Sequence, residues 1–525
     1  MRADLVLAID EGTSSARAIV YDPTWQPIAT ASRRLRTDHP QAGWAEQDPD
    51  AIVSAVVEVV GEALDAVGGP ERIAAAGLAN QGETVVAWDR HSGAALAPAI
   101  LWSCRRSQPI VERVATAGHG PRIRQLTGLP LDPYFSASKL RWLLETVPAV
   151  RRAATDGRLA FGTVDAWLTA RLGAGADVAA GASPAAGAAA AARTDPSTAS
   201  RTQLMGLASL AWDDELLGIW DLDRRTLPAI VPTVGDLGSL HHPSWGAALP
   251  LRAMVCDQQA ALAGQAGQRP GAIKATFGTG VFVLANAGSS VPQPSDGILA
   301  TVAWTDAAGR PTYALDGGVF SAGSLLDWLH ADLGIVDPPN DLDRLAGEVP
   351  DSGGVRLLPA LAGLGAPWWD PAARVTLTGL SAATRRSHLA RAALDAIAQR
   401  TADIIDAMAP LAGTVRAIGA GGAGPLRVDG GLAASDRLVQ RLADLINGRV
   451  EVAADGESTA LGTAILAAIG AGRMDDQEAA RIPGTRRTVE PALAEPERRA
   501  ERDAWRDFVE RAIALSHPAP GSTHD

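Results

Sequence analysis

Residues 5–21 read LVLAIDEGTSSARAIVY, an apolar run followed by a polar turn and a second apolar run. This pattern predicts a β-hairpin in which Asp10 stands at the end of the first strand. The turn contains a glycine and three hydroxyl residues and is followed by an arginine: Gly12, Thr13, Ser14, Ser15 and Arg17. Backbone amides and hydroxyls in such a turn are suited to wrap a phosphate, and a carboxylate at a strand end is suited to hold hydrated Mg²⁺. The alternative is an ordinary hydroxyl-rich hairpin turn.

Two later segments repeat this theme. Residues 276–280 (TFGTG) form a second turn of glycine and threonine, and residues 427–431 (RVDGG) again end a strand in Asp and Gly. Glycine allows a backbone to approach a phosphate or a flat ring closely. The two halves of the chain therefore predict a duplicated nucleotide-binding core with a cleft between the copies. A P-loop is excluded, because no Gly-Lys-Ser/Thr sequence occurs.

Strand and helix patterns alternate along the chain. Strands are predicted at residues 73–79, 85–88 and 426–428, a hairpin around 276–284, and helices at 49–66, 136–145, 166–171, 324–330 and 388–408. Such alternation favours an α/β layer architecture.

The composition is that of a globular protein. The chain has 525 residues, of which 47% are hydrophobic and 20% charged. Its 47 basic and 59 acidic residues give a net charge of −12, which argues against a nucleic acid or an anionic membrane as a partner. Two cysteines are too few for a disulfide framework, no apolar run is long enough to span a membrane, and the first residues lack a signal-peptide pattern. We therefore expect a cytoplasmic protein.

The length predicts two large domains or about three of average size. We expect an N-terminal domain over residues 1–265, a C-terminal domain over 266–495, and a charged tail over 496–525 that contains one surface helix. Residues 173–193 are rich in alanine and glycine, which predicts a flexible surface insertion without chemistry. Residues 419–424 are expected to form a similar loose loop.

A series of short segments, in order along the chain, matches one known family. Besides residues 10–17 they are GLANQGET (77–84), AILWSCRR (99–106), TGLPLDPYFS (127–136), FGTVD (161–165), DQQAA (257–261), FGTGVF (277–282), GLGAPWWDP (363–371) and LRVDGG (426–431). Through them the chain resembles the FGGY family of carbohydrate kinases, and within it most of all the glycerol kinases, over about residues 4–475. The resemblance implies two ribonuclease H-like domains, as in actin and the heat-shock chaperone ATPases, which close over ATP and a sugar or polyol.

The resemblance also implies roles for individual residues. Asp257 matches the general base, which is needed because a neutral hydroxyl is a poor nucleophile; a helix-capping aspartate is the alternative. ATP and Mg²⁺ are the implied cofactors, with Asp10 at the metal. The nucleotide contacts fall on Thr13, Ser14, Ser15, Arg17, Thr279, Gly323, Asp327, Gly431 and Ser435. Asp327 and Ser435 stand where glycerol kinases usually carry glutamine and asparagine, so altered rather than lost nucleotide contacts are expected.

The implied substrate site combines aromatic walls for the carbon face of a polyol with charged groups for its hydroxyls. Its matching residues are Glu83, Trp102, Tyr134, Asp257, Gln258 and Phe282. The family's substrate-binding arginine has no match, because Gly82 occupies its place. This loss would weaken glycerol binding about a hundredfold, unless a group such as Arg105 or Arg106 replaces it. The missing side chain is also expected to open volume for a longer substrate. Cys256, where glycine is frequent, is expected to have little consequence.

The sequence thus predicts an ATP-dependent kinase that phosphorylates a terminal hydroxyl of a small polyol, with glycerol, giving glycerol 3-phosphate, as the first candidate. The same reaction on erythritol, a pentitol or a pentulose is the alternative. A non-catalytic nucleotide or sugar sensor and an actin-like filament protein are two hypotheses from other classes. Small-molecule polyols or sugars and ATP or ADP are the expected partners, without nucleic acid or membrane insertion. Homodimer and homotetramer are both compatible with the sequence.

Overall fold

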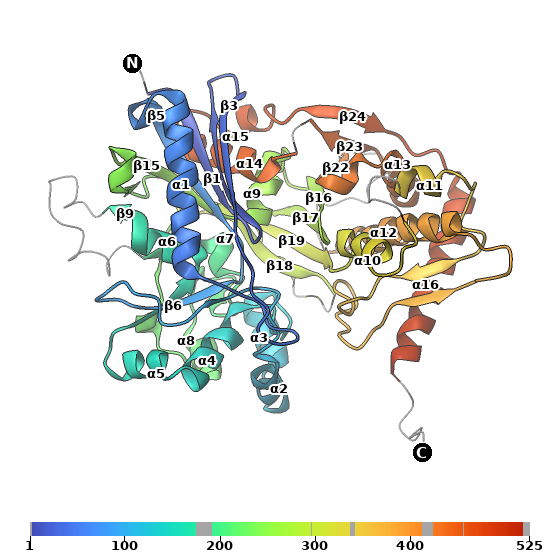
Figure 1. Ribbon diagram of the computed structural model, residues 1–525, viewed down its shortest axis with the longest axis horizontal. Helices are drawn as coiled ribbons and strands as arrows, with labels where there is room; N and C mark the ends of the chain where they lie inside the picture. Colours follow the sequence, from blue (N-terminus) through green and yellow to red (C-terminus); the bar gives the residue numbers. More distant parts are fainter. Residues whose placement is uncertain are drawn as a thin grey trace.

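The computed structural model describes residues 3–174, 192–293, 295, 297–336, 342–411, 424–454 and 456–517. Figure 1 shows two lobes, one formed by the first half of the chain in blue to green and one by the second half in yellow-green to red. Most of the Ala- and Gly-rich stretch 173–193 and of the predicted loop 419–424 lies outside the described residues. Within the described ranges, no helix combines the length and the apolar character needed to cross a membrane.

The N-terminal lobe is built on a seven-stranded sheet with the order β3-β2-β1-β5-β15-β14-β9. Its strands are β1 (Leu5–Glu11), β2 (Ser15–Tyr21), β3 (Pro27–Arg34), β5 (Ile73–Asn80), β9 (Gly173–Ala174), β14 (Ser239–Leu240) and β15 (Leu249–Cys256). The first three strands form an antiparallel meander, whereas β5 and β15 run parallel to β1. Asp10 lies opposite Arg17 in the first hairpin, so the predicted hairpin is confirmed.

Alternation along β1 sends its side chains to two different helical layers. Leu5, Leu7 and Ile9 pack in one core cluster with the buried stripe of α1 (Pro49–Val67), and α6 (Val164–Leu172) contributes to the same cluster. Helix α1 begins after Asp48, whose side chain accepts a hydrogen bond from the Asp50 amide. The even residues of β1 face the opposite layer, which contains α9 (Asp257–Gly264) and α14 (Ser458–Gly470). The sheet is therefore covered on both faces.

Helix α14 comes from the second half of the chain but packs on the N-terminal sheet, as Figure 1 shows beside β1. It crosses α9 at very short range, and glycine is required at the crossing. A Cβ atom at Gly462 would lie 1.8 Å from the Ala260 carbonyl oxygen, and one at Gly264 would lie 2.0 Å from the Ser458 carbonyl oxygen. Since α9 begins at Asp257, this crossing positions the predicted general base at the junction of the two lobes.

A smaller unit is inserted into the N-terminal lobe. Its four-stranded sheet has the order β4-β7-β6-β8, and five helices surround it. The elements are β4 (Glu46–Gln47), β6 (Val85–Asp89), β7 (Ala99–Ile100), β8 (Leu159–Thr163), α2 (Gln108–Thr116), α3 (Gly120–Thr127), α4 (Ser136–Thr146), α5 (Pro148–Thr155) and α8 (Asp214–Trp220). Segments at its strand and helix ends supply several of the predicted substrate residues.

The C-terminal lobe repeats the arrangement of the first sheet. Its order is β18-β19-β17-β16-β22-β23-β24. The strands are β16 (Ile273–Phe277), β17 (Val281–Gly288), β18 (Leu299–Thr305), β19 (Pro311–Val319), β22 (Leu426–Asp429), β23 (Val450–Ala453) and β24 (Thr485–Val489). Strands β16, β17, β19 and β18 pair antiparallel in this spatial order, and β22 and β23 run parallel to β16. The predicted duplicated α/β core is confirmed in this common order.

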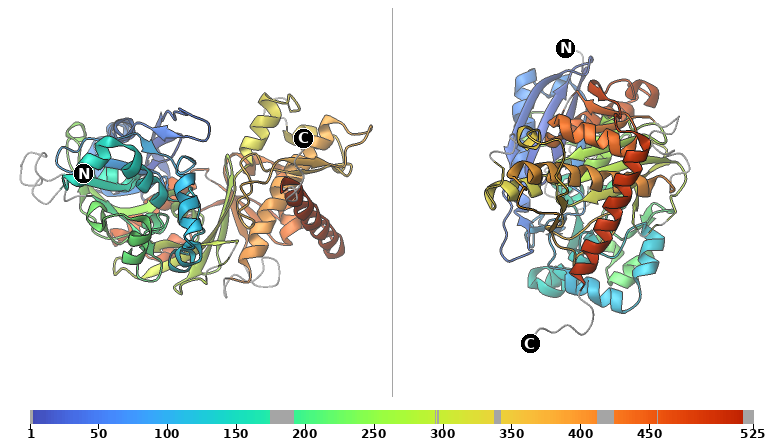
Figure 2. Two further views of the ribbon diagram at one scale, coloured as in Figure 1. Left: turned by 90° about the horizontal axis from the view of Figure 1, so that it is seen from below. Right: turned by 90° about the vertical axis from the view of Figure 1, so that its right-hand side faces the viewer.

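Helices complete the C-terminal lobe, among them the predicted helices at residues 324–330 and 388–408. They are α10 (Gly323–Ala331), α11 (Leu342–Ala346), α12 (Arg386–Met408), α13 (Asp436–Ile446) and α16 (Glu495–Ser516). Figure 2 shows α16 lying along this lobe. Helix α16 falls within the predicted charged tail, yet Trp505, Phe508, Val509 and Ala512 are buried in the core of the lobe. Arg502, which is also buried, pairs with Asp403 of α12 at 2.8 Å.

Candidate active site

The turn between β1 and β2 is held by hydrogen bonds to the side chains of Trp102, Gln47 and Gln81. The Trp102 indole nitrogen donates to Thr13 Oγ1 at 2.9 Å, and Gln47 donates to the Thr13 carbonyl oxygen at 2.6 Å. Thr13 in turn donates to Gln81 Oε1 at 3.2 Å. Ser14, at the tip, is exposed. Thr13 therefore connects the predicted phosphate turn with the predicted polyol pocket.

Two buried carboxylates stand at the end of β1. Burial, and secondarily the charge of Asp257, raise the pKa of Asp10 to about 7. Burial also raises the pKa of Glu11 to about 8, although hydrogen bonds from Gln81 act to lower it. Arg17, on the neighbouring strand, forms an ion pair of 2.7 Å with Glu457, just before α14. Several carboxylates thus lie close together at the end of β1, where burial disfavours their ionised forms.

The glycine turns of the C-terminal lobe lie close together at the ends of the central strands of its sheet. The Ala322 amide donates to the Thr279 carbonyl oxygen at 3.0 Å, and the Gly323 amide donates to the Gly278 carbonyl oxygen at 3.1 Å. Glycine is needed at two of these contacts, because a Cβ atom at Gly323 would lie 2.6 Å from the Gly278 oxygen and one at Gly430 would lie 2.3 Å from the Phe277 oxygen. The structure therefore brings the segments 278–280, 322–323 and 430–431 together.

The remaining predicted nucleotide residues lie on the adjoining helices. Asp327 is exposed on α10, one turn after Gly323. Ser435 caps α13, where its hydroxyl accepts from the Leu438 amide at 3.0 Å and donates to Asp343. Its hydroxyl is thus already engaged in two hydrogen bonds within the lobe.

Aromatic rings from both lobes line the predicted polyol pocket. The ring of Trp102 lies 5.6 Å from Tyr134 and 6.5 Å from Phe282, both in edge-to-face orientation. Tyr134 also stacks at 6.4 Å on Phe320, which no sequence argument singled out. Trp102 and Tyr134 come from the inserted unit and Phe282 from β17, so the wall spans the junction of the two lobes.

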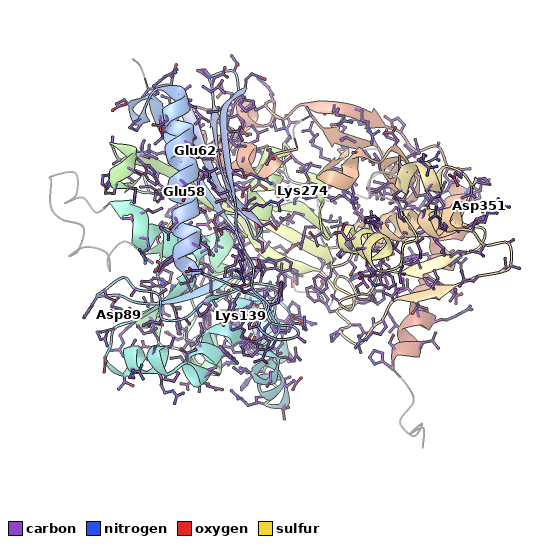
Figure 3. All side chains as sticks on the ribbon, in the orientation of Figure 1. Glu58, Glu62, Asp89, Lys139, Lys274 and Asp351 are labelled. Atoms are coloured by element: carbon purple, nitrogen blue, oxygen red, sulfur yellow. The ribbon has the colours of Figure 1, made fainter. Side chains whose placement is uncertain are left out.

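Asp257 is half-buried at the first position of α9. Burial raises its pKa, whereas a hydrogen bond from the Gln258 amide at 2.6 Å lowers it. The next side chain, Gln258, accepts from the Lys274 ammonium at 2.7 Å, and Lys274 also donates to Thr276 at 3.0 Å. Figure 3 shows Lys274 near the middle of the molecule. Lys274 is a buried cation close to Asp257 that the sequence analysis missed.

Glu83, the residue after Gly82, belongs to a buried ion-pair triad. Arg201 Nε donates to Glu83 Oε1 at 2.6 Å, and Arg201 Nη1 lies 2.8 Å from Asp316 Oδ2. All three side chains are at most 8% exposed. Burial raises the pKa of Glu83, and the charge of Arg201 opposes that shift. Neither Arg201 nor Asp316 was predicted, because nothing near them in the sequence marks them as partners of Glu83.

The two arginines that the sequence suggested as substitutes are engaged elsewhere. Arg106 pairs with Glu46 at 2.7 Å and lies over the ring of Trp44. Arg105 lies 3.7 Å from Asp132. The expected opening of volume at Gly82 does not extend to the space directly beside this residue, because a Cβ atom there would lie only 2.9 Å from Cys256 Sγ. The thiol of Cys256 fills the space in which a side chain at residue 82 would begin.

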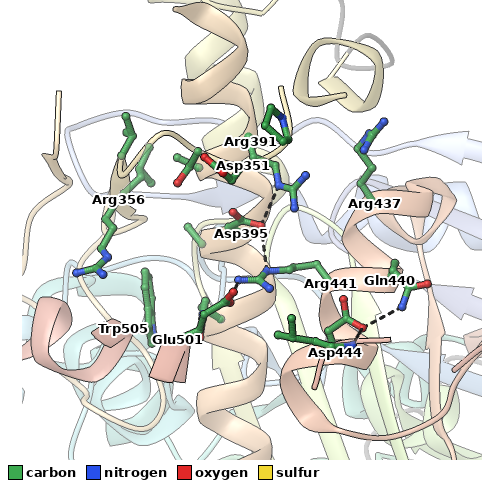
Figure 4. A pocket seen from close by; sticks show the side chains of 18 of the residues that line it. Asp351, Arg356, Arg391, Asp395, Arg437, Gln440, Arg441, Asp444, Glu501 and Trp505 are labelled. Carbon is green, nitrogen blue, oxygen red and sulfur yellow. Dashed lines mark hydrogen bonds and ion pairs between the residues drawn. The ribbon is translucent and has the colours of Figure 1, made fainter. Parts of the chain in front are cut away.

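A separate pocket of about 1080 Å³ lies between α11, α12, α13 and α16 (Figure 4). Its charged side chains are largely paired with one another: Asp395 contacts Arg391 at 3.3 Å and Arg441 at 3.2 Å, and Arg441 also contacts Glu501. None of the site residues predicted from the sequence lines it. We therefore place the candidate active site at the junction of the lobes.

The chain matches known proteins over nearly its whole length. The N-terminal domain of the FGGY family of carbohydrate kinases matches residues 5–264, and the C-terminal domain of that family matches residues 273–471. A glycerol kinase from Halorhodospira halophila is 42% identical over 523 residues, which cover 99% of each chain. Glycerol kinase 2 from Thermotoga maritima is 38% identical over 510 residues, which cover 97% of this chain and 98% of that one.

Solved structures give the same picture. The glycerol kinase of Plasmodium falciparum with ADP has a TM-score of 0.87 at 28% identity, and the match covers 97% of this chain and 98% of that one. The gluconate kinase of Lactobacillus acidophilus shares the fold, with a TM-score of 0.82 at 22% identity and 98% coverage of both chains.

Proposed function

The chain belongs to the FGGY family of carbohydrate kinases, and on that premise we propose that it transfers the γ-phosphoryl group of ATP to a terminal hydroxyl of glycerol, giving glycerol 3-phosphate. The observation that carries this proposal is a cluster of side chains where the lobes meet: the rings of Trp102 and Tyr134 lie 5.6 Å apart, and Glu83 is paired with Arg201. Burial raises the pKa of both Glu83 and Tyr134, and Asp257, at the start of α9, is close enough for its charge to add to both shifts. The similarity to glycerol kinases at 42% and 38% identity supports glycerol as the acceptor.

In this proposal Asp257 is the general base. It accepts the proton of the attacking hydroxyl while the new O–P bond forms and the bond between the γ-phosphorus and ADP breaks. Burial raises the pKa of Asp257, which makes its carboxylate a stronger base than an exposed aspartate. The aromatic rings of Trp102, Tyr134 and Phe282 exclude water from the acceptor, so that transfer to the polyol competes better with hydrolysis.

The phosphates of ATP are proposed to lie between the two glycine turns. Thr13, Ser14, Ser15 and Arg17 would bind them from the N-terminal lobe, and Thr279 would bind them from the C-terminal lobe. Gly323, Asp327, Gly431 and Ser435 would lie toward the nucleoside. Arg17 would exchange its ion pair with Glu457 for a phosphate oxygen, which is inexpensive because both side chains of that pair are 39% exposed.

Asp10 fits a role in binding Mg²⁺. Its pKa is raised to about 7 by burial and by neighbouring carboxylates, so a cation nearby would stabilise its ionised form. The described residues contain no group of three or more His, Cys, Asp or Glu side chains that could hold a metal by themselves. Mg²⁺ would therefore be held by Asp10 together with phosphate oxygens and water, and it would neutralise charge on the phosphates.

The test is coupled ADP release with glycerol, erythritol, a pentitol and a pentulose as acceptors. We expect glycerol to give the highest kcat/KM; a strong preference for a longer acceptor would overturn the choice of glycerol. Asp257→Asn should lower kcat by about 10²–10⁴-fold while ADP still binds. Asp214→Asn, at the exposed start of α8, is the matched control and should retain activity. Nucleotide binding without turnover on any acceptor would favour a sensor.

We also propose a cellular location and an oligomeric state. Both cysteines, Cys104 and Cys256, are buried and free, as expected for a protein of the reducing cytoplasm. We propose that the chain assembles into a homodimer or a homotetramer, which light scattering coupled to gel filtration distinguishes.

A further inference from the structure

Arg201 places a positive charge beside Glu83, whereas residue 82, where an arginine is expected, is a glycine. Its side chain is 4% exposed and pairs with Glu83, a predicted substrate residue. Its guanidinium carbon lies 5.9 Å from the centre of the Tyr134 ring, a second predicted substrate residue. The guanidinium therefore lies beside two predicted substrate residues, although Arg201 is 118 residues away from Glu83 in the chain.

The backbone that carries Arg201 is firmly held. Helix α7 (Pro196–Ala199) begins at Asp195, whose side chain accepts from two amides of the first turn. The Arg201 amide then donates to the Thr198 carbonyl oxygen at 3.0 Å, and the neighbouring Ser200 hydroxyl bonds to Thr301 of β18 at 2.7 Å. A guanidinium on such a support is preorganised and loses little freedom when it binds a ligand.

The hydrogen-bonding capacity of Arg201 is not exhausted by its two carboxylate partners. Nη1 lies within ion-pair distance of Asp316, yet it makes no hydrogen bond with any described residue. No hydrogen bond among the described residues involves Nη2 either. Nη1 is enclosed and faces Asp316, so Nη2 is the nitrogen that remains for a polar ligand.

Two unusual residues of the pocket face each other. Gly82 stands where an arginine is expected, and Cys256 stands where glycine is frequent. A Cβ atom at residue 82 would lie 2.9 Å from Cys256 Sγ and 3.9 Å from Arg201 Cγ. The thiol therefore fills the space in which a side chain at residue 82 would begin, and the stem of Arg201 borders it.

We propose that Arg201 binds the substrate, its guanidinium donating to hydroxyl oxygens of the polyol in place of the missing arginine, and that Cys256 keeps the pocket to the size of a three-carbon polyol. Nη2 carries two hydrogens, which suit two adjacent oxygens, as in a vicinal diol. Asp316 belongs to β19 of the C-terminal lobe, so the same guanidinium also couples substrate binding to the approach of the two lobes. This inference rests on the proposed kinase function.

The test compares Arg201→Lys with Arg106→Lys. Both arginines are buried and paired with a glutamate, at 4% and 3% side-chain exposure, but Arg106 lies over Trp44 outside the triad. Arg201→Lys keeps the positive charge but loses the planar guanidinium and its additional hydrogen-bond donors. KM for glycerol should therefore rise about 10- to 100-fold, whereas KM for ATP should change less than about twofold. Arg106→Lys should leave KM for glycerol unchanged. An unchanged KM for glycerol in Arg201→Lys, or an equal rise of both KM values, would overturn the assignment.

A second variant guards against misfolding. Arg201→Gln combined with Asp316→Asn keeps the net charge of the triad, so it does not leave two buried carboxylates unpaired. It should show the same rise in KM for glycerol, and added guanidinium ions should partly reverse it. A glycerol KM equal to that of the natural chain would refute the role of Arg201. If the natural chain phosphorylated no polyol, the kinase function itself would fail; if it preferred erythritol to glycerol, only the size restriction would fail.

Discussion

The contact between Gly82 and Cys256 leads to a sharp prediction about a single methyl group. In Gly82→Ala the new Cβ atom would lie 2.9 Å from Cys256 Sγ, whereas ordinary contacts of this kind are 3.4–4 Å. The backbone itself accepts alanine, because Gly82 is not among the residues with positive φ. The overlap of about 0.5 Å falls on a side chain that is 3% exposed and has little room to move.

The expected cost follows from this overlap. Overpacking by one methylene in a tight core typically costs about 1–3 kcal/mol. For a cooperative unit of 150–250 residues this corresponds to a loss of roughly 2–12 °C in melting temperature. Cys256 precedes Asp257, and its thiol lies 3.6 Å from Asp257 Oδ1, so a displaced thiol also shifts the proposed base. We expect kcat to fall by up to about 100-fold.

The assay is a double-mutant cycle read by thermal denaturation and by glycerol turnover. Cys256→Ala removes the sulfur, so Gly82→Ala should cost much less in that background, with a coupling of about 1–2 kcal/mol. Gly218→Ala is the matched control: it lies in α8, where an added Cβ atom meets nothing within 4 Å. Strictly additive losses in the cycle would refute the steric coupling of the two positions.

Three further predictions concern charge and packing. The pKa of Asp10 is raised to about 7, so neutral Asp10 stabilises the cation-free protein fully below about pH 4, and this stabilisation is lost as the pH rises through 7. The melting temperature should therefore fall over this pH range, and Asp10→Asn should make the fall smaller. An unaltered dependence of melting temperature on pH in Asp10→Asn would contradict this prediction. Glu457→Gln releases Arg17 from its half-exposed ion pair, so KM for ATP should fall by up to about fivefold in steady-state assays. A rise in KM for ATP would show that the ion pair supports nucleotide binding instead. Trp505→Ala should destabilise the C-terminal lobe by about 3–5 kcal/mol, measured by denaturation, with KM for glycerol unchanged.

Local features of the fold were predictable because they depend on residues close together in the chain. The hairpin of residues 5–21 follows from alternation around a glycine turn, and α1 follows from apolar residues at helical spacing after Asp48. Strand β15, which leads to Asp257, was not predicted. Helix α14 was missed as well, since it is apolar on nearly all sides and covers a sheet formed some 400 residues earlier.

The sequence by itself determined the order of the glycine turns, the duplication of the core and the family, and it supplied most of the residues proposed for the active site. Only the tertiary structure decided which cation stands beside Glu83. Arg106 was a reasonable candidate by proximity in the chain, but packing commits it to Glu46 and Trp44 and brings Arg201 to Glu83 instead. A periodic pattern records which face of an element is buried. It does not record which distant segment packs against that face, because long-range contacts depend on how all the elements pack together.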